Sequence, residues 1–253
     1  MHSNRLKLPD SGFPLSGSNV LLCNMSELSL SFPDYLSDTE QARLQTISNP
    51  AQAKFYQHSR GLLRTLLGQL LHQPPAEICF SNTAHGKPQL TQHQLQFNIS
   101  HSQHWLCIAL ATVPVGVGVD IEFTAQAPIR PWLALAKRFF TANEYQHLTK
   151  QPADQLANHF FQLWTQKEAV LKAHGGGISA GLQRLDLLTH LHSLDEQRYE
   201  TEYSQPIPQL HCAVSLQTKA ETPISYYILN DQLEIETLLP PYIHHLCLKP
   251  NSL

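Results

Sequence analysis

The sequence predicts an α+β protein, because a helical pattern followed by strand-like segments occurs twice along the chain. In the first half, apolar residues recur at helical spacing over 51–71. In the second half, helical stretches near 130–149 and 153–174 follow a strand at 116–123. Further strand-like segments lie near 76–81, 95–99, 105–111, 183–188, 210–216 and 224–229. No sequence repeat accompanies this order, so the residues alone do not establish a duplication.

The composition is that of a globular protein without a basic excess or a disulfide framework. With 253 residues, 42% of them hydrophobic, the chain can form one large domain or two modest ones. Its formal net charge of -3 argues against nucleic acid as a main partner. The 5 cysteines lack C-x-x-C spacing, and the 15 histidines lack a metal-ligand pattern. No apolar run reaches membrane-spanning length, so we expect a cytoplasmic enzyme with neither membrane nor nucleic-acid partners.

The segment 164–172, Trp-Thr-Gln-Lys-Glu-Ala-Val-Leu-Lys, places ionisable groups on the side of a helix that should be buried. With a turn of about 100° per residue, Lys167, Glu168 and Lys172 fall inside or beside the apolar arc. That arc consists of Phe160, Phe161, Leu163, Trp164, Val170 and Leu171. Burying a carboxylate is unfavourable unless it meets a cation, a metal or hydrogen bonds. The pattern favours a functional site, and a structural ion pair is the alternative.

The segment 116–123 is predicted to be a strand with one apolar face and one acidic face. Because side chains alternate along a strand, Asp120 and Glu122 share a face with Gly116 and Gly118. Two carboxylates on one face suit a hard divalent cation bound through oxygen. The glycines would leave room for a ligand to approach. The alternative is an edge strand whose polar face meets water, and Glu168 on its own unusual helix favours the metal site.

Hydroxyl groups surround a histidine in Phe97-Asn98-Ile99-Ser100-His101-Ser102, just before the buried strand 105–111. Several donors at one point suit phosphate recognition, whereas a satisfied structural histidine is the alternative. Upstream, Gly86-Lys87-Pro88 indicates a turn that carries a cation. By itself that tripeptide also fits a solvated turn.

In this order the segments resemble the 4′-phosphopantetheinyl transferase superfamily, specifically its larger surfactin-synthetase-activating type. The matching pieces are Gly86-Lys87-Pro88, Phe97 to Ser102, Gly118 to Glu122, Lys137-Arg138-Phe139-Phe140 with Glu144 and Tyr145, and Trp164 to Lys172 with Gly175 and Gly177. The resemblance covers roughly residues 54–190. It implies two similar α/β halves related by pseudo-twofold symmetry, with the active site in the cleft between them. With a boundary near Pro114, residues 1–114 would supply the nucleotide contacts and 115–253 the metal-binding and catalytic residues.

The resemblance implies a Mg²⁺-dependent transfer, in which Mn²⁺ can substitute for Mg²⁺. The phosphopantetheine arm of coenzyme A would move to a serine of an apo acyl or peptidyl carrier protein, releasing adenosine 3′,5′-bisphosphate. Asp120, Glu122 and Glu168 would be the metal ligands, and Glu168 would also accept the serine proton. Lys172 would neutralise the diphosphate or protonate the departing phosphate. The carrier could serve fatty-acid, polyketide or non-ribosomal peptide synthesis, and the enzyme is expected to be a monomer.

Further cations are expected to bind coenzyme A. The positions that the resemblance assigns to this task are Arg60, Thr65, Lys87, Ser100, His101 and Lys172. Some relatives have paired lysines before the first helix, where this chain reads Asn49-Pro50-Ala51-Gln52-Ala53-Lys54. We therefore expect the 3′-phosphate to depend more on Arg60, Lys87 and His101. Lys167 would be a structural cation, whereas Glu144 matches an acidic position of the family but also fits a solvated helix surface.

Two other functions are compatible with parts of the sequence. A serine hydrolase could use Ser100 or Ser102 with His101 and Asp120, although no G-x-S-x-G motif is present. A non-catalytic module could bind coenzyme A or a carrier protein without turnover. The intact set of three carboxylates and two helix lysines favours the enzyme.

Overall fold

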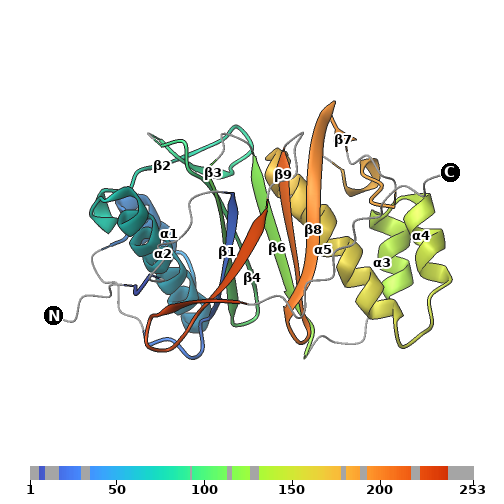
Figure 1. Ribbon diagram of the computed structural model, residues 1–253, viewed down its shortest axis with the longest axis horizontal. Coiled ribbons are helices and arrows are strands. Elements are labelled where there is room, and N and C mark those ends of the chain that lie inside the picture. Colours follow the sequence, from blue (N-terminus) through green and yellow to red (C-terminus); the bar gives the residue numbers. More distant parts are fainter. Residues whose placement is uncertain are drawn as a thin grey trace.

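Two β-sheets pack against each other through their inner faces, and helices cover the outer face of each sheet (Figure 1). The computed structural model describes residues 6–8, 17–29, 35–91, 93–112, 116–125, 131–177, 181–188, 193–217 and 223–238. Among the helices within these ranges, none combines the length and the apolar character needed to cross a bilayer.

The first sheet has the strand order β11-β10-β1-β5-β4. Its strands are β1 (Ser18–Asn24), β4 (Gln96–Ser102), β5 (Trp105–Ala111), β10 (Ile224–Leu229) and β11 (Ile235–Thr237). The other elements of this layer are α1 (Asp38–Gln45), α2 (Pro50–Leu71), the 3-10 turn Pro75–Glu77, β2 (Phe80–Asn82) and β3 (Pro88–Leu90). Strand β1 pairs with β10 in parallel and with β5 antiparallel. Segments far apart in the sequence therefore share this sheet.

The second sheet has the strand order β6-β9-β8-β7 and is antiparallel throughout. Its strands are β6 (Val117–Phe123), β7 (Ser193–Leu194), β8 (Gln197–Ile207) and β9 (Leu210–Gln217). Helix α5 (Leu156–His174) packs on its outer face, and α3 (Trp132–Phe139) and α4 (Ala142–Thr149) lie beyond α5 (Figure 1).

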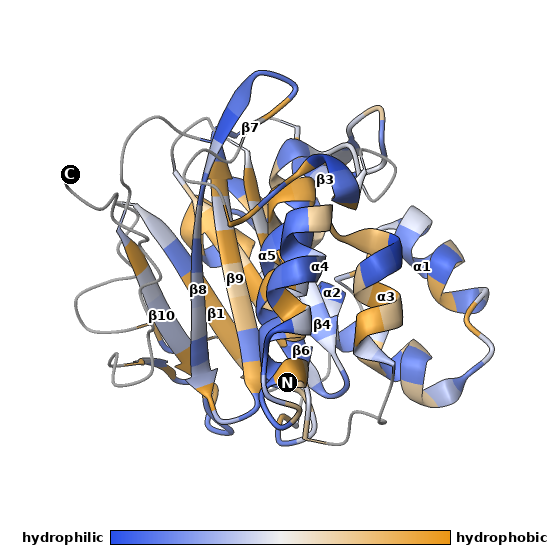
Figure 2. Ribbon diagram, turned by 90° about the vertical axis from the view of Figure 1, so that its right-hand side faces the viewer, coloured by the Kyte–Doolittle hydropathy of each residue, from blue (hydrophilic) through white to orange (hydrophobic). Residues whose placement is uncertain are grey.

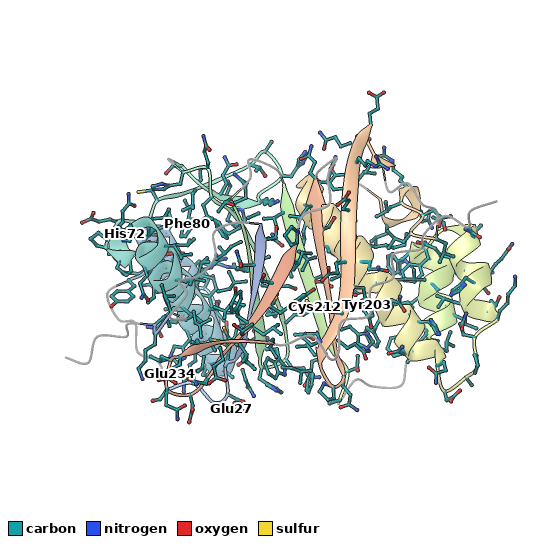
Figure 3. All side chains as sticks on the ribbon, in the orientation of Figure 1. Glu27, His72, Phe80, Tyr203, Cys212 and Glu234 are labelled. Atoms are coloured by element: carbon teal, nitrogen blue, oxygen red, sulfur yellow. The ribbon has the colours of Figure 1, made fainter. Side chains whose placement is uncertain are left out.

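Alternation along the central strands supplies the core between the sheets. On β1, Val20 and Leu22 face the second sheet, whereas Leu21 and Cys23 pack toward α2. Both faces of β1 are therefore buried, and Figure 2 shows β1 and β9 as predominantly hydrophobic. Cys212 on β9 and Tyr203 on β8, which are labelled in Figure 3, belong to opposite faces of the second sheet. A strand with two buried faces reads as a continuous apolar run, as β5 does.

Local capping explains where the helices of the second layer begin and end. Thr141 Oγ1 accepts from the Glu144 N–H, and the Glu144 carboxylate accepts from the Thr141 N–H, forming a capping box at the start of α4. This cap interrupts the helix predicted near 130–149, which is two helices, α3 and α4. Helix α5 ends at Gly175 with φ 84°, a left-handed conformation that glycine adopts readily.

The predicted α+β class is confirmed, and most of the predicted helices and strands are present. The strand predicted near 183–188 is wrong, because Leu182–Arg184 form a 3-10 turn. Strands β1 and β8 and helix α1 were not predicted.

The predicted boundary at Pro114 lies outside the described residues, between β5 and β6. Strands β10 and β11 pair within the first sheet. The described strands at the end of the second part, 115–253, thus complete the first sheet, and the division of roles between 1–114 and 115–253 stays a prediction. The pseudo-twofold relation of the halves stays a prediction.

Candidate active site

The two sheets meet edge to edge along β4 and β6, where side chains replace backbone pairing. Asn98, Ser100 and Ser102 alternate along β4 and therefore share one face of that strand. The backbone N–H groups of Val119, Ile121 and Phe123 donate to Asn98 Oδ1, Ser100 Oγ and Ser102 Oγ at 2.9, 3.4 and 3.0 Å. The strand that carries the two acidic residues is thus fixed to the other sheet.

Helix α5 lies very close to β6 because two glycines face it. A Cβ atom added to Gly118 would lie 2.0 Å from the Ala169 carbonyl oxygen, and one added to Gly116 would lie 2.4 Å from that of Ala173. The expectation that these glycines leave room for a ligand is wrong, since the helix backbone occupies the space. The close approach brings the side chains of α5 next to the carboxylates of β6.

Asp120 lies at the centre of the cluster and is almost fully buried. Its Oδ1 accepts from Lys172 Nζ at 2.7 Å and from Ser100 Oγ at 2.8 Å. Lys172 Nζ also donates to Ser100 Oγ and to the Val119 carbonyl oxygen. The other carboxylate oxygen of Asp120, Oδ2, is buried without a hydrogen-bond partner among the described residues. A buried carboxylate oxygen of this kind has lone pairs free to accept a hydrogen bond or to bind a cation.

Glu122 and Glu168 complete the acidic cluster. Burial and the charge of Asp120 raise the pKa of Glu122 to about 7, although the hydrogen bond from Ser102 Oγ to Glu122 Oε2 opposes this shift. Burial and the charge of Asp120 also raise the pKa of Glu168 to about 7, against the effect of Lys172. The three carboxyl groups therefore interact electrostatically, and a cation among them would relieve both their desolvation and their repulsion.

The cluster is not a preformed metal cage. Within the described ranges, no three His, Cys, Asp or Glu side chains are gathered closely enough to hold a metal ion as they stand. Lys172 instead neutralises one oxygen of Asp120. The chemistry of the donor set nevertheless fits Mg²⁺, which prefers carboxylate oxygens, binds through one or two of them and keeps several waters. The three-carboxylate magnesium site stays a prediction.

Lys87, in the turn between β2 and β3, reaches across to the second layer. Its Nζ donates to the carbonyl oxygens of Val117 at 2.8 Å and Ala173 at 3.3 Å. Burial lowers the pKa of Lys87 to about 8. The side chain therefore links the hairpin to both β6 and the end of α5. The alternative that Lys87 lies in a solvated turn is thus wrong.

Two further predicted coenzyme A contacts, His101 and Arg60, belong to the first layer. The His101 ring is exposed on β4 and contacts Phe55 edge-on at 5.2 Å between ring centroids. Partial burial of the imidazole lowers the pKa of His101, and the charge of Lys172 adds to this shift. Arg60 is half-buried, with its guanidinium over Tyr56.

Two other predicted contacts have different roles in the structure. Thr65 is buried in α2, where its hydroxyl donates to the Gly61 carbonyl oxygen at 2.8 Å. The hydroxyl hydrogen of Thr65 is thus used within the helix, and its contact with coenzyme A stays a prediction. Ser100 uses its hydroxyl within the cluster, donating to Asp120 and accepting from Lys172. Its direct hydrogen bond to Asp120 also removes the basis for a relay through His101, which the hydrolase alternative required.

Lys167 and Glu144 form a second, fully buried ion pair, with 2.7 Å between Nζ and Oε2 and 0% exposure of both side chains. Lys167 also donates to the carbonyl oxygens of Leu182 and Leu185, while Glu144 Oε1 accepts from the Leu187 N–H. The solvated-surface alternative for Glu144 is therefore wrong. Lys167 is a structural cation, as predicted.

Sequence reasoning missed Asn98 and Ser102 as parts of the site. Their signal is a polar residue at every second position of β4, from Gln96 to Ser102, which indicates an edge paired through side chains. The sequence pattern alone predicts a role in phosphate recognition for these hydroxyls.

Comparison with known proteins agrees with the motifs. Residues 116–226 match the family described as "4'-phosphopantetheinyl transferase superfamily", and residues 25–113 match "4'-phosphopantetheinyl transferase, N-terminal". The 4'-phosphopantetheinyl transferase psf-1 of Bacillus pumilus is 44% identical over 130 residues, 47% of this chain and 53% of that protein. HetI of Nostoc sp. is 36% identical over 156 residues, 60% of this chain and 64% of that protein. This chain thus spans less than two thirds of either relative.

A third relative is covered more completely. The 4'-phosphopantetheinyl transferase Sfp of Bacillus subtilis is 34% identical over 169 residues, which are 61% of this chain and 72% of that protein. The two family matches meet between β5 and β6, where the acidic strand begins. On these matches and on the motifs that the structure brings together at the junction, the chain belongs to the 4′-phosphopantetheinyl transferase superfamily, in its surfactin-synthetase-activating group.

Proposed function

We propose that this chain transfers the phosphopantetheine arm of coenzyme A to a serine of an apo acyl or peptidyl carrier protein, with release of adenosine 3′,5′-bisphosphate. The observation that carries the proposal is the junction of β4, β6 and α5. There Asp120, with one buried and unpartnered oxygen, lies with Glu122, Glu168 and Lys172 at the meeting line of the two layers. All of the relatives named above are 4′-phosphopantetheinyl transferases.

Asp120, Glu122 and Glu168 would hold Mg²⁺, or Mn²⁺ in its place. The bound cation would offset the negative charge that develops on the diphosphate. Lys172, whose ammonium is partly exposed, supplies a fixed positive charge beside the same diphosphate and stabilises the departing phosphate. Glu168 is the base that accepts the proton of the serine hydroxyl, directly or through water. Ser100 orients both Asp120 and Lys172.

The nucleotide of coenzyme A would bind to the first layer. Lys87, Arg60 and His101 belong to that layer and would share the phosphate charge. The partners of the proposed enzyme are coenzyme A and an apo carrier protein, without nucleic acid or membrane. We propose that it acts in the cytoplasm as a monomer.

Intact-mass analysis of a carrier protein tests this function. Purified protein, Mg²⁺ and coenzyme A should convert several apo carriers to a form heavier by one phosphopantetheine arm. Asp120→Asn should lower the transfer rate by about three orders of magnitude, equivalent to about 4 kcal/mol, and chelation should stop transfer until Mg²⁺ or Mn²⁺ is restored. Binding of coenzyme A without any mass gain would instead support the non-catalytic module. Release of phosphate or thiol without a modified carrier would support a hydrolase.

A further inference from the structure

The β4–β6 junction contains a repeated arrangement of serine and carboxylate. Ser100 Oγ accepts from the Ile121 N–H and donates to Asp120. Two residues further along, Ser102 Oγ accepts from the Phe123 N–H at 3.0 Å and donates to Glu122 Oε2 at 3.0 Å. Each hydroxyl thus binds the backbone of β6 with its oxygen and the neighbouring carboxylate with its hydrogen.

We propose that Ser102 is a positioning residue for Glu122, which fixes this carboxylate in the orientation that binds the divalent cation. The inference deepens the proposed function and rests on it for the identity of the cation. It goes beyond the ligand set, because Ser102 contributes no ligand and acts through Glu122.

Geometry gives the hydroxyl this role. A serine hydroxyl has a single hydrogen, and Ser102 directs it to Glu122, because its oxygen is already fixed by the Phe123 N–H. Glu122 is only half-buried, so packing alone does not fix its rotamer. Hydrogen bonds to metal-ligating carboxylates typically change metal affinity about 10- to 100-fold.

Gln103 supplies a matched control at the next position. Its Nε2 donates to the Phe123 carbonyl oxygen at 3.0 Å, so it also joins β4 to β6. That hydrogen bond touches no carboxylate. Removing it takes away one hydrogen bond between β4 and β6 without releasing Glu122.

The experiment measures Mn²⁺ binding to the purified chain in the presence of coenzyme A, from the electron paramagnetic resonance signal of free Mn²⁺. Ser102→Ala should raise the Mn²⁺ dissociation constant about tenfold. Ser102→Thr keeps the hydroxyl and should stay within about threefold of the wild type, since strands accept β-branched residues. Gln103→Ala should bind Mn²⁺ like the wild type. Thermal unfolding of all variants reports the integrity of the junction, and excess Mg²⁺ should restore most of the transfer rate of Ser102→Ala.

The outcomes separate the two proposals. Equal Mn²⁺ affinity of Ser102→Ala and wild type would overturn the positioning role, as would an equal loss in Gln103→Ala or a wild type that binds no Mn²⁺. If Ser102→Ala does not fold, Ser102→Cys, whose thiol is a weaker donor, should show an intermediate loss, and wild-type affinity would overturn the role. Mn²⁺ binding that follows this pattern without transfer to any carrier would support the positioning role while contradicting the proposed function.

Discussion

Helix α5 contributes the lysines of two lysine–carboxylate ion pairs, which have the same nitrogen–oxygen distance but differ in solvent exposure. Lys167 and Glu144 are 2.7 Å apart, as are Lys172 and Asp120. Both side chains of the first pair are fully buried, whereas 28% of the Lys172 side chain and 8% of that of Asp120 are exposed. Two lysines of one helix therefore form ion pairs of equal length in different environments.

The difference lies in what remains unsatisfied. In the first pair, Lys167 has two carbonyl acceptors besides Glu144, and both oxygens of Glu144 accept backbone N–H groups. In the second pair, Oδ2 of Asp120 has no partner among the described residues. A fully satisfied pair fixes structure, whereas an incompletely satisfied one can exchange its partner for a ligand.

Among the substitutions that test this comparison, Lys167→Met should have the largest effect, a loss of stability. It leaves the Glu144 carboxylate buried without a cation, so the free energy of unfolding should fall by about 3–5 kcal/mol. Urea denaturation measures the loss. Lys172→Met is the matched variant and should lose less than Lys167→Met, because Lys172 is partly exposed and Ser100 still donates to Asp120. Equal losses would show that the two pairs do not differ as we infer.

Lys172→Met should separate function from stability. Removal of the ammonium beside the proposed diphosphate site should lower the transfer rate about 100-fold, which corresponds to about 3 kcal/mol. The rate is measured at saturating coenzyme A and Mg²⁺ by intact mass of the carrier. Lys150→Met, at the exposed end of α4, is the control and should retain the wild-type rate. An unchanged rate in Lys172→Met would leave this pair without a catalytic role.

Gly118→Ala tests whether the distance between α5 and β6 determines the site. The added methyl group would overlap the Ala169 carbonyl and push the helix away. The free energy of unfolding should fall by about 1–3 kcal/mol. The transfer rate should also fall, because Glu168 and Lys172 move with α5. Gly86→Asn is the control, since nothing lies near that turn position and Asn tolerates its positive φ. A tolerated Gly118→Ala with full activity would contradict the close packing.

The pH dependence of coenzyme A affinity should give the smallest effect. Because burial lowers the pKa of Lys87 to about 8, its charge is lost above that pH, and the dissociation constant should rise about tenfold between pH 7 and pH 9. Lys87→Arg keeps its proton and should flatten this profile. The same pKa shift affects the free energy of unfolding in the opposite direction. The unfolded lysine holds its proton up to its usual pKa, so stability rises with pH above 8. A flat affinity profile in the wild type would exclude Lys87 as a phosphate contact.

The sequence was sufficient where one residue type has one physical consequence. The alternation in 116–123 predicted which side chains share a face, and the helical arc predicted that Lys167 and Glu168 are buried. It was insufficient where the partner is distant in the chain. Nothing near Glu144 shows that Lys167 will neutralise it, and nothing near Gly118 shows that a helix rather than a ligand will fill the space.

The errors in predicting the fold also arise where distant or local contacts, rather than periodicity, decide the structure. The 130–149 segment keeps helical periodicity across Thr141, and only the capping box with Glu144 shows that the helix restarts there. Strand β1 is buried on both faces, so it lacks the alternation that identifies a half-exposed strand. Its pairing with β10 is a tertiary contact that no local pattern announces.

That parallel pairing of β1 with β10 has a consequence for biosynthesis. Ser18 is aligned with Ile224, so the ribosome makes all of the residues between these two strands before β1 finds this neighbour. Until then an apolar strand presents an open edge, a known template for aggregation. Residues 1–112 expressed alone should therefore be insoluble. Fusing residues 223–238 to that fragment should restore its solubility.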